Sequence, residues 1–301
     1  DNYRHIEPRL SLRYKLNATS SIKAAYTENY QYVHLASTSS VSLPTDLWVP
    51  SSSGIKPKFA RQYALGYFKN LNDNMYETSL EAYYKEMTNL IEYREGYLPE
   101  DNTNSSSDDS FTFGDGESYG IEVLLKKIKG KTTGWIGYTL SKTTRYFDEV
   151  NNGIPFPAKY DRRHDLSITA THKLSKSWVL SGVFVYASGN SITLPTERYV
   201  IGGDIYTQFT SRNGFRVDPY HRMDIGATYT PSKKMKKFKS SWNFSIYNVY
   251  SRKNPYFIYF ALEGLDDNVE NQNIQNGNVE PKAYQVSIFP ILPSITWNFN
   301  F

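Results

Sequence analysis

The residues with the most potential for acid–base chemistry form the run Asp161-Arg162-Arg163-His164-Asp165. A histidine beside a carboxylate can act as a general base, so the run could belong to a hydrolase. Neighbouring residues of a strand point to opposite faces of the sheet, however, which would separate His164 from Asp165. We therefore expect no catalytic site and no enzyme. We favour a structural ladder of ion pairs facing the inside of the protein, formed by Arg163, Asp165, Arg222 and Asp224.

Other side chains that could bind a metal or a cofactor lack the spacing that such sites need. The five histidines show no metal-ligand pattern, and the chain contains no cysteine. An acidic loop with Asp108, Asp109, Asp115 and Glu117 has oxygen ligands for Ca²⁺, but not the residue order of a calcium-binding loop. We therefore expect no metal and no cofactor. The net charge of +4 with interspersed signs predicts no nucleic-acid partner.

The composition favours strands at a boundary between water and lipid. Only 39% of the residues are hydrophobic, but 26 Tyr, 16 Phe and 5 Trp raise the aromatic share to 16%. Tyrosine is amphipathic and favours strands. No stretch approaches the roughly 18 apolar residues of a membrane-spanning helix. If this chain lies in a membrane, it must therefore cross it as a closed barrel.

Alternation with a period of two residues recurs along the whole chain and predicts eleven strands. Their connections alternate between short turns and long, polar loops, as in a transmembrane β-barrel with tight turns on one side and long loops on the other. A soluble sandwich or propeller gives no reason for such alternation. The expected strands are 5–16, 21–33, 59–71, 75–94, 117–128, 132–147, 161–174, 178–188, 218–230, 240–251 and 283–301. The expected long loops are 34–58, 95–116, 148–160, 189–217 and 252–282.

The facing of the side chains is inverted relative to a soluble protein. In the last strand, Ile295, Trp297, Phe299 and Phe301 share one face, and polar residues occupy the other. This pattern predicts lipid outside and water or protein inside. Tryptophans close to the short turns and to the C-terminus predict an aromatic girdle at one membrane interface: Trp135, Trp178, Trp242 and Trp297. Charges assigned to the inner face are Arg9, Arg13, Lys15, Lys23, Arg61, Glu77, Glu81, Lys85, Glu122, Arg163, Asp165, Arg222 and Asp224.

Several segments resemble the barrels of TonB-dependent outer-membrane receptors, particularly those of the Bacteroidetes. The segments are Leu43–Pro50 with Ile55-Lys56-Pro57, Tyr160–Leu166, Tyr220–Ile225 and Asn248–Pro255. The alternating aromatics that end at Phe301 also resemble the signal read by the barrel-assembly machinery. The resemblance implies an all-β fold: an antiparallel transmembrane β-barrel of twenty-two strands, preceded by a plug and a segment that contacts TonB.

Eleven strands would be half of such a barrel. If the last strand descends towards the short-turn side, the first of eleven descends too, and at least one strand must precede it. We therefore expect 1–301 to be the C-terminal part of one barrel domain, with the plug and the N-terminal strands absent from this chain.

The expected function is active uptake of a scarce nutrient across the bacterial outer membrane, with ligand bound by the long extracellular loops. Aromatic loop residues are the candidate ligand contacts: Trp48, Tyr97, Tyr199, Tyr206 and Tyr256. Trp297, Phe299 and Phe301 are the candidate assembly signal. Expected partners are the missing plug and strands, the TonB complex, the barrel-assembly machinery, lipid or lipopolysaccharide, and a surface lipoprotein. A passive porin and an outer-membrane β-barrel enzyme remain as alternatives, and the substrate stays open among siderophores, haem, cobalamin, glycans and peptides.

Overall fold

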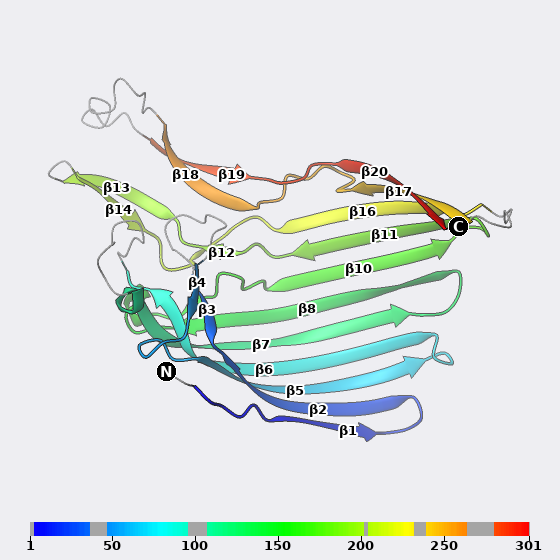
Figure 1. The fold of residues 1–301 in the computed structure, drawn as a ribbon, viewed down its shortest axis with the longest axis horizontal. Coiled ribbons are helices and arrows are strands. Elements are labelled where there is room, and N and C mark those ends of the chain that lie inside the picture. Colours follow the sequence, from blue (N-terminus) through cyan, green and yellow to red (C-terminus); the bar gives the residue numbers. More distant parts are fainter. Residues whose placement is uncertain are drawn as a thin grey trace.

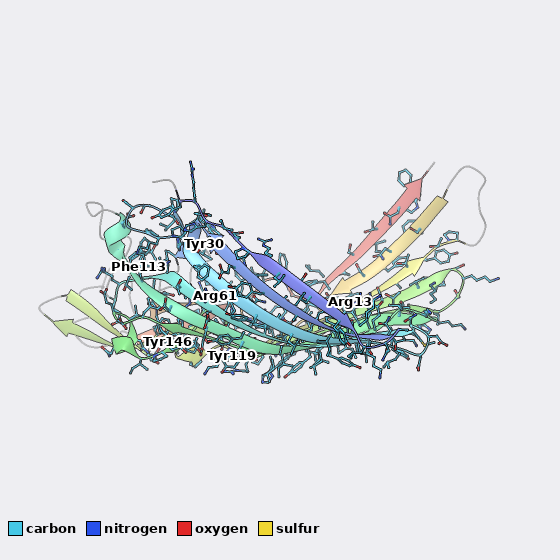
Figure 2. All side chains as sticks on the ribbon, turned by 90° about the horizontal axis from the view of Figure 1, so that it is seen from below. Arg13, Tyr30, Arg61, Phe113, Tyr119 and Tyr146 are labelled. Carbon is cyan, nitrogen blue, oxygen red and sulfur yellow. The ribbon has the colours of Figure 1, made fainter. Side chains whose placement is uncertain are left out.

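The computed structural model describes residues 3–36, 47–95, 107–201, 204–231, 239–263 and 280–300. Its main feature is one curved antiparallel sheet, and each of the eleven principal strands pairs with its neighbour along the path (Figures 1 and 2). The eleven predicted strands are confirmed. They are β1 (Arg9–Lys15), β2 (Ser20–Gln31), β5 (Lys58–Leu71), β6 (Tyr76–Tyr93), β7 (Phe111–Lys127), β8 (Thr132–Tyr146), β10 (His164–Lys173), β11 (Trp178–Ala187), β16 (Tyr220–Tyr229), β17 (Lys239–Tyr247) and β20 (Leu292–Asn300).

The two ends of the sheet differ as the sequence predicts. The tight turns lie at one end, on the right in Figure 1, and the long connections lie at the other. We call them the short-turn end and the long-loop end. Both β1 and β20 run towards the short-turn end, and among the described strands each pairs with a single neighbour.

The turns at the short-turn end are stabilised by their own residues. The Oδ1 atom of Asn17 accepts hydrogen bonds from the backbone N–H groups of Thr19 (2.9 Å) and Ser20 (2.8 Å). The run Asn72-Asp73-Asn74 has three positive φ values, which Asn and Asp tolerate better than other side chains. Each of these turns therefore depends on residues within a few positions of one another.

The long loops contain strands that the sequence did not predict. They form three hairpins, a small pairing of β12 (Ser191–Ile192) with β15 (Phe215–Arg216), and a short strand β9 (Phe156–Pro157) that pairs antiparallel with the end of β8. The hairpins are β3 (Val33–Ala36) with β4 (Leu47–Pro50), β13 (Pro195–Ile201) with β14 (Asp204–Phe209), and β18 (Phe257–Glu263) with β19 (Glu280–Val286). Two short 3-10 turns, η1 (Ser107–Ser110) and η2 (Asn151–Gly153), complete the described elements. Within these described ranges, no helix is long and apolar enough to cross a membrane.

Two predicted boundaries are wrong. Strand β7 begins at Phe111 instead of 117, because 111–116 pairs with the end of β6 past a bulge after Met87. The predicted strand 283–301 is two strands, β19 and β20, which belong to different sheets. Between β19 and β20, Pro290 lacks a backbone donor and Phe289 has a φ of 56°, so the chain cannot continue there as one ladder.

Register gives the sheet two chemically distinct faces. One cross-strand row contains Leu12, Ala24, Leu65, Ala82, Ile121 and Leu140, and another contains Trp178, Tyr229, Trp242 and Trp297. We call this apolar side the outer face; many of its side chains are exposed, including Leu65 (58%) and Ile295 (67%). The opposite, inner face carries polar and charged residues, so the expected inversion is present.

Two residues lie on a different face from the one expected. Trp135 is near a short turn, but its register partners are Lys126 and Thr169, which lie on the inner face. It is therefore not part of the outer girdle formed by Trp178, Trp242 and Trp297. Arg61 shares the outer face with Tyr63 and pairs there with Glu28 (Nε–Oε1, 3.1 Å). It lies beyond the aliphatic part of its strand, where a charge on the outer face can stay hydrated.

The fully buried apolar side chains gather at the long-loop end. One cluster joins the β3–β4 hairpin to the ends of β6 and β7, and the other packs β6 against the segment after β8. The clusters are Ala36, Val49, Ile55, Ile91, Tyr93 and Phe111, and Leu90, Phe147, Val150 and Phe156. The long loops therefore have small cores of their own.

Candidate functional site: the inner face and its long-loop rim

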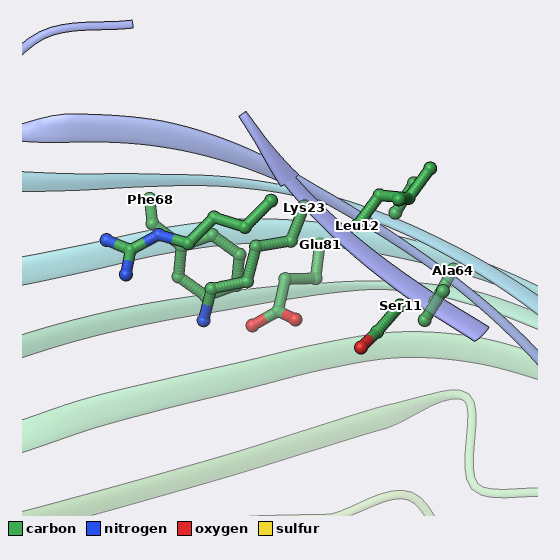
Figure 3. Close-up of a pocket in the computed structure, with 10 residues that line it drawn as sticks. Ser11, Leu12, Lys23, Ala64, Phe68 and Glu81 are labelled. Carbon is green, nitrogen blue, oxygen red and sulfur yellow. The ribbon is translucent and has the colours of Figure 1, made fainter. Parts of the chain in front are cut away.

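The inner wall contains a hollow near the open edge of β1, with a volume of about 570 Å³ (Figure 3). Its floor is made by small residues: Ala25 pairs with Ala64 across β2 and β5, and Gly66 pairs with Lys23. A Cβ at Gly66 would lie 2.9 Å from Cγ of Glu81, so glycine leaves the space that the hollow needs.

Charges surround this hollow without pairing within it. The Lys23 ammonium lies over the Phe68 ring at 3.9 Å, and Arg13 donates from Nε to the Oγ of Ser21 (3.2 Å). Glu81 and Glu122 are direct register partners on the next strands. Figure 3 shows Lys23 and Glu81 on the same side of the ribbon, opposite Leu12. The wall is therefore polar and suited to contact with water or with another polar surface.

The expected inner-face charges at the starts of β10 and β16 behave differently. Arg222 pairs with Asp224 (Nη2–Oδ2, 2.9 Å) and donates to the hydroxyl of Tyr247 (2.6 Å). Asp224 also accepts the backbone N–H of Asn248 (2.9 Å). Among the residues that the structure describes, Arg163 and Asp165 form no ion pair with each other. Arg222 and Asp224 therefore fix the chain where it leaves β17. Arg163 and Asp165 do not form, in the described part of the chain, the ion pair that the sequence predicts.

His164 lies on the outer face, where its Nδ1 atom is 2.8 Å from the hydroxyl of Tyr138. Asp165 lies on the inner face, so the two residues do not share a site. The same outer arrangement recurs at His221, whose Nδ1 is 2.8 Å from the hydroxyl of Tyr250. These rings form a second aromatic row, near the long-loop end, which the sequence analysis did not identify.

Asp161 ties the long loop 189–217 to the rim of the sheet. Its side chain is only 2% exposed and accepts the backbone N–H of Thr143 at Oδ1 (2.7 Å). Arg216 donates to Oδ2 of Asp161 (2.7 Å), to its carbonyl oxygen, and to the carbonyl of Gly189 (2.8 Å). A Cβ at Gly189 would lie 1.8 Å from the Val217 carbonyl oxygen, so only glycine allows the loop to close here.

Glu92 makes a second attachment for the same loop. Its Oε2 accepts from Nη2 of Arg212 (2.7 Å), and its Oε1 pairs with Nη1 of Arg145 on β8. Glu92 and Arg212 are 6% and 7% exposed, so this contact is removed from water. The loop is thus attached at two buried carboxylates, Asp161 in the segment before β10 and Glu92 on β6.

The loop before β5 is also attached, through the β3–β4 hairpin. Ser52 donates from Oγ to Oδ2 of Asp108 (2.6 Å), and His34 is fully buried with its Nε2 atom 3.2 Å from the Oγ of Ser51. The Nδ1 atom of His34 has no partner in the described part of the chain. Burial lowers the pKa of His34, and the nearby Lys58 ammonium lowers that pKa further.

The structure brings few of the expected ligand contacts together. Trp48 on β4 is 61% exposed, and Tyr256 before β18 is 53% exposed. Tyr199 and Tyr206 are backbone register partners in the β13–β14 hairpin. Tyr97 and Phe301 lie outside the described residues. Trp297 and Phe299 lie on the outer face, and Trp297 stacks on Trp242 with ring centroids 5.6 Å apart.

Sequence reasoning missed the residues that hold the loops. Asp161 lies in a segment singled out for its charges, but nothing near it in the chain indicates that Arg216 is its partner. Glu92 and Arg212 are even further apart in sequence, at 120 residues. Among the described residues, no group of three His, Cys, Asp or Glu side chains could hold a metal ion.

Comparison with protein families matches residues 1–249 to the TonB dependent receptor-like β-barrel. Comparison with curated proteins gives no match. Three solved structures share the fold at low sequence identity. The unliganded ferric citrate transporter FecA has a TM-score of 0.55 and 12% identity, over 97% of this chain and 37% of that chain. BauA, the ferric preacinetobactin receptor from Acinetobacter baumannii, has a TM-score of 0.54 and 15% identity, over 98% and 36%. The ferripyoverdine receptor of Pseudomonas aeruginosa has a TM-score of 0.53 and 17% identity, over 84% and 29%. The chain therefore spans about a third of the length of these structures.

Proposed function

Because the chain belongs to the TonB-dependent receptor-like β-barrel family, we propose that it forms the C-terminal part of an outer-membrane receptor that takes up a scarce nutrient with energy from the TonB complex. The observation that carries this proposal is the family match over residues 1–249, in a chain whose curved sheet is apolar outside and charged inside. Such a sheet suits lipid on one face and a polar plug or water on the other.

The aromatic rows support a position for the membrane. Trp178, Tyr229, Trp242 and Trp297 form one row, and the His164 and His221 clusters form the other, with aliphatic side chains between them. An apolar groove of about 540 Å³ runs over Leu180, Ile225, Phe244 and Ile295 in this band and fits acyl chains. The long-loop end then faces the outside of the cell.

This orientation can be tested by labelling single cysteines in intact cells, since the described chain has no cysteine of its own. Ser53→Cys lies in an exposed position at the long-loop end, and Lys176→Cys lies in an exposed short turn. A membrane-impermeant maleimide should label position 53 in intact cells, and position 176 only after lysis. Labelling of position 176 alone in intact cells contradicts the orientation.

The open edges support further strands in the complete barrel. Because β1 and β20 run in the same direction, closing them directly would give one parallel pair in an antiparallel sheet. An odd number of additional strands restores antiparallel order throughout. We propose that eleven such strands and a plug domain precede this chain, which gives twenty-two strands in total.

We propose that the long loops bind the ligand, with Trp48, Tyr97, Tyr199, Tyr206 and Tyr256 as contacts. The similar structures are named for ferric citrate, ferric preacinetobactin and ferripyoverdine, which makes a metal chelate the first class of ligand to test. Trp297, Phe299 and Phe301 would be read by the barrel-assembly machinery. The outer face would meet lipid and lipopolysaccharide, and a surface lipoprotein could cover the loops.

The decisive experiment compares uptake in cells with and without TonB. The full-length protein is expressed in both backgrounds, and uptake of radiolabelled ferric chelates is followed over time. Uptake should require both the receptor and TonB. Receptor-dependent uptake that continues at its full rate without TonB contradicts the proposal and favours a passive porin.

A further inference from the structure

The inner wall at the long-loop end carries a surplus of positive charge. Register places Lys58 of β5, Lys85 and Glu92 of β6, and Arg145 of β8 on the same inner face. Arg212 reaches this place from the loop between β14 and β15. The group therefore contains four cations and one carboxylate, and it lies at the rim of the wall, where material entering from the loops would first meet it.

The single carboxylate, that of Glu92, already pairs with two arginines. Oε1 of Glu92 pairs with Arg145, and Oε2 pairs with Arg212 at 2.7 Å. Both Glu92 and Arg212 are more than nine-tenths buried. One negative charge therefore neutralises one of two guanidinium groups, and neither lysine forms an ion pair with Glu92 in the described part of the chain.

The two lysines lack a carboxylate of their own. Among the residues that the structure describes, neither Lys58 nor Lys85 forms an ion pair. The charged groups that act most strongly on the Lys58 ammonium are Arg145, Lys85 and Glu92, and two of these three are cations. Like charges repel strongly where burial weakens solvent screening. The three cations therefore destabilise one another, and a bound anion would reduce this repulsion.

We propose that Lys58, Lys85 and Arg145 bind an oxyanion group, a carboxylate, phosphate or sulfate, of the ligand that this protein takes up. This inference rests on the proposed function for its ligand, and it narrows that ligand to an anionic class.

The side chains suit that chemistry. The Arg145 side chain is 26% exposed and uses Nη1 for Glu92, which leaves further N–H donors for an anion. Its planar guanidinium, fixed by Glu92, presents paired donors that match a carboxylate or phosphate. The flexible ammonium groups of Lys58 on β5 and Lys85 on β6 then supply further positive charge. Because Glu92 holds Arg145 in place before a ligand arrives, little ordering of that side chain is needed on binding.

The hollow near β1 provides a contrast on the same face. There Lys23 is covered by the Phe68 ring, and Glu81 and Glu122 lie on the next strands, so positive and negative groups are balanced. A negatively charged ligand should therefore bind at the long-loop rim in preference to the hollow. Lys15 and Lys23 supply a matched control pair, since they lie on the inner face towards the short-turn end.

The test uses the full-length receptor in detergent with inorganic phosphate as the probe. Phosphate binding is followed by broadening of its ³¹P resonance, at constant ionic strength set with chloride. The unsubstituted receptor should show saturable broadening. The double variant Lys58→Met/Lys85→Met should weaken the apparent affinity by at least about ten-fold, because two charge-assisted contacts are lost. The control Lys15→Met/Lys23→Met changes the net charge equally and should bind phosphate as before.

Three results overturn the inference: no saturable binding by the unsubstituted receptor, as when an acidic segment of the protein itself fills the site; equal weakening in both double variants; or unaltered binding in Lys58→Met/Lys85→Met. Unchanged β-sheet circular dichroism shows that each variant is folded. The proposed function is tested separately by TonB dependence of uptake. Uptake that needs TonB together with unaltered phosphate binding in Lys58→Met/Lys85→Met sinks the inference alone, and phosphate binding with TonB-independent uptake sinks the proposed function alone.

Discussion

The two ends of this sheet are organised by different kinds of interaction. At the short-turn end, Asn17 and Ser175 each close a turn by accepting the backbone N–H groups two and three residues further along the chain. At the long-loop end, Asp161 bonds Arg216 and Glu92 bonds Arg212, residues far apart in the chain. The short-turn end therefore needs only its own sequence to form. The long-loop end needs the sheet to be in place first, and in return its loops are held in defined positions over the lumen.

The strongest test of this contrast removes a buried attachment of loop 189–217. Asp161→Ala removes the carboxylate that accepts from Nη2 of Arg216 and from the backbone N–H of Thr143, at a local cost of about 3 kcal/mol or more. Amide hydrogen exchange in 189–192 and 215–217 should accelerate, while exchange in β10 and β11 stays slow. Asp148→Ala, at an exposed position on the same rim, is the control. If amide exchange in these segments is equally slow in both variants, the Asp161–Arg216 contact does not hold the loop in place.

The second test compares the two faces in the middle of β10. Ile168 lies on the outer face and Thr169 on the inner face, one residue apart. Ile168→Arg places a charge against lipid and should destabilise the full-length barrel by about 2–4 kcal/mol, whereas Thr169→Arg should cost far less. Urea unfolding in lipid vesicles, followed by tryptophan fluorescence, measures both. The reverse order of stability would mean that the faces are exchanged.

The sequence predicts this architecture well where one local pattern decides the structure. Alternation locates all eleven strands, and the turn residues locate the short-turn end. Face assignment follows from alternation too, and Arg61 was misplaced because its charge was weighed above its spacing from Tyr63 and Leu65. The loop hairpins and the Asp161–Arg216 contact could not be predicted, because their partners are distant in sequence and short loop strands carry no distinctive period.

A third test uses pH at the β3–β4 hairpin. Folding lowers the pKa of His34 from its usual 6.5, so the open hairpin binds more protons than the closed one as the pH falls through this range. The hairpin is therefore stabilised above about pH 6.5 and loses stability on acidification. Hydrogen exchange of 33–36 and 47–50, normalised to β6, should accelerate between about pH 7.5 and about pH 5. His34→Gln should abolish this dependence, whereas His5→Gln, at an exposed position, should retain it.

The smallest expected effect lies at the short-turn end. The Oγ atom of Ser175 accepts the backbone N–H groups of Ser177 (3.1 Å) and Trp178 (3.0 Å). Ser175→Ala removes both bonds in a turn where water can replace the lost acceptor, so the expected cost is about 0.5–1 kcal/mol. Lys176→Ala in the same turn should be close to neutral, because the described structure gives its side chain no bond. The midpoints of urea unfolding of Ser175→Ala and Lys176→Ala measure this difference in stability. A loss at Ser175 as large as that of Asp161→Ala, or one that spreads into the long loops, would show that the two ends are not independent.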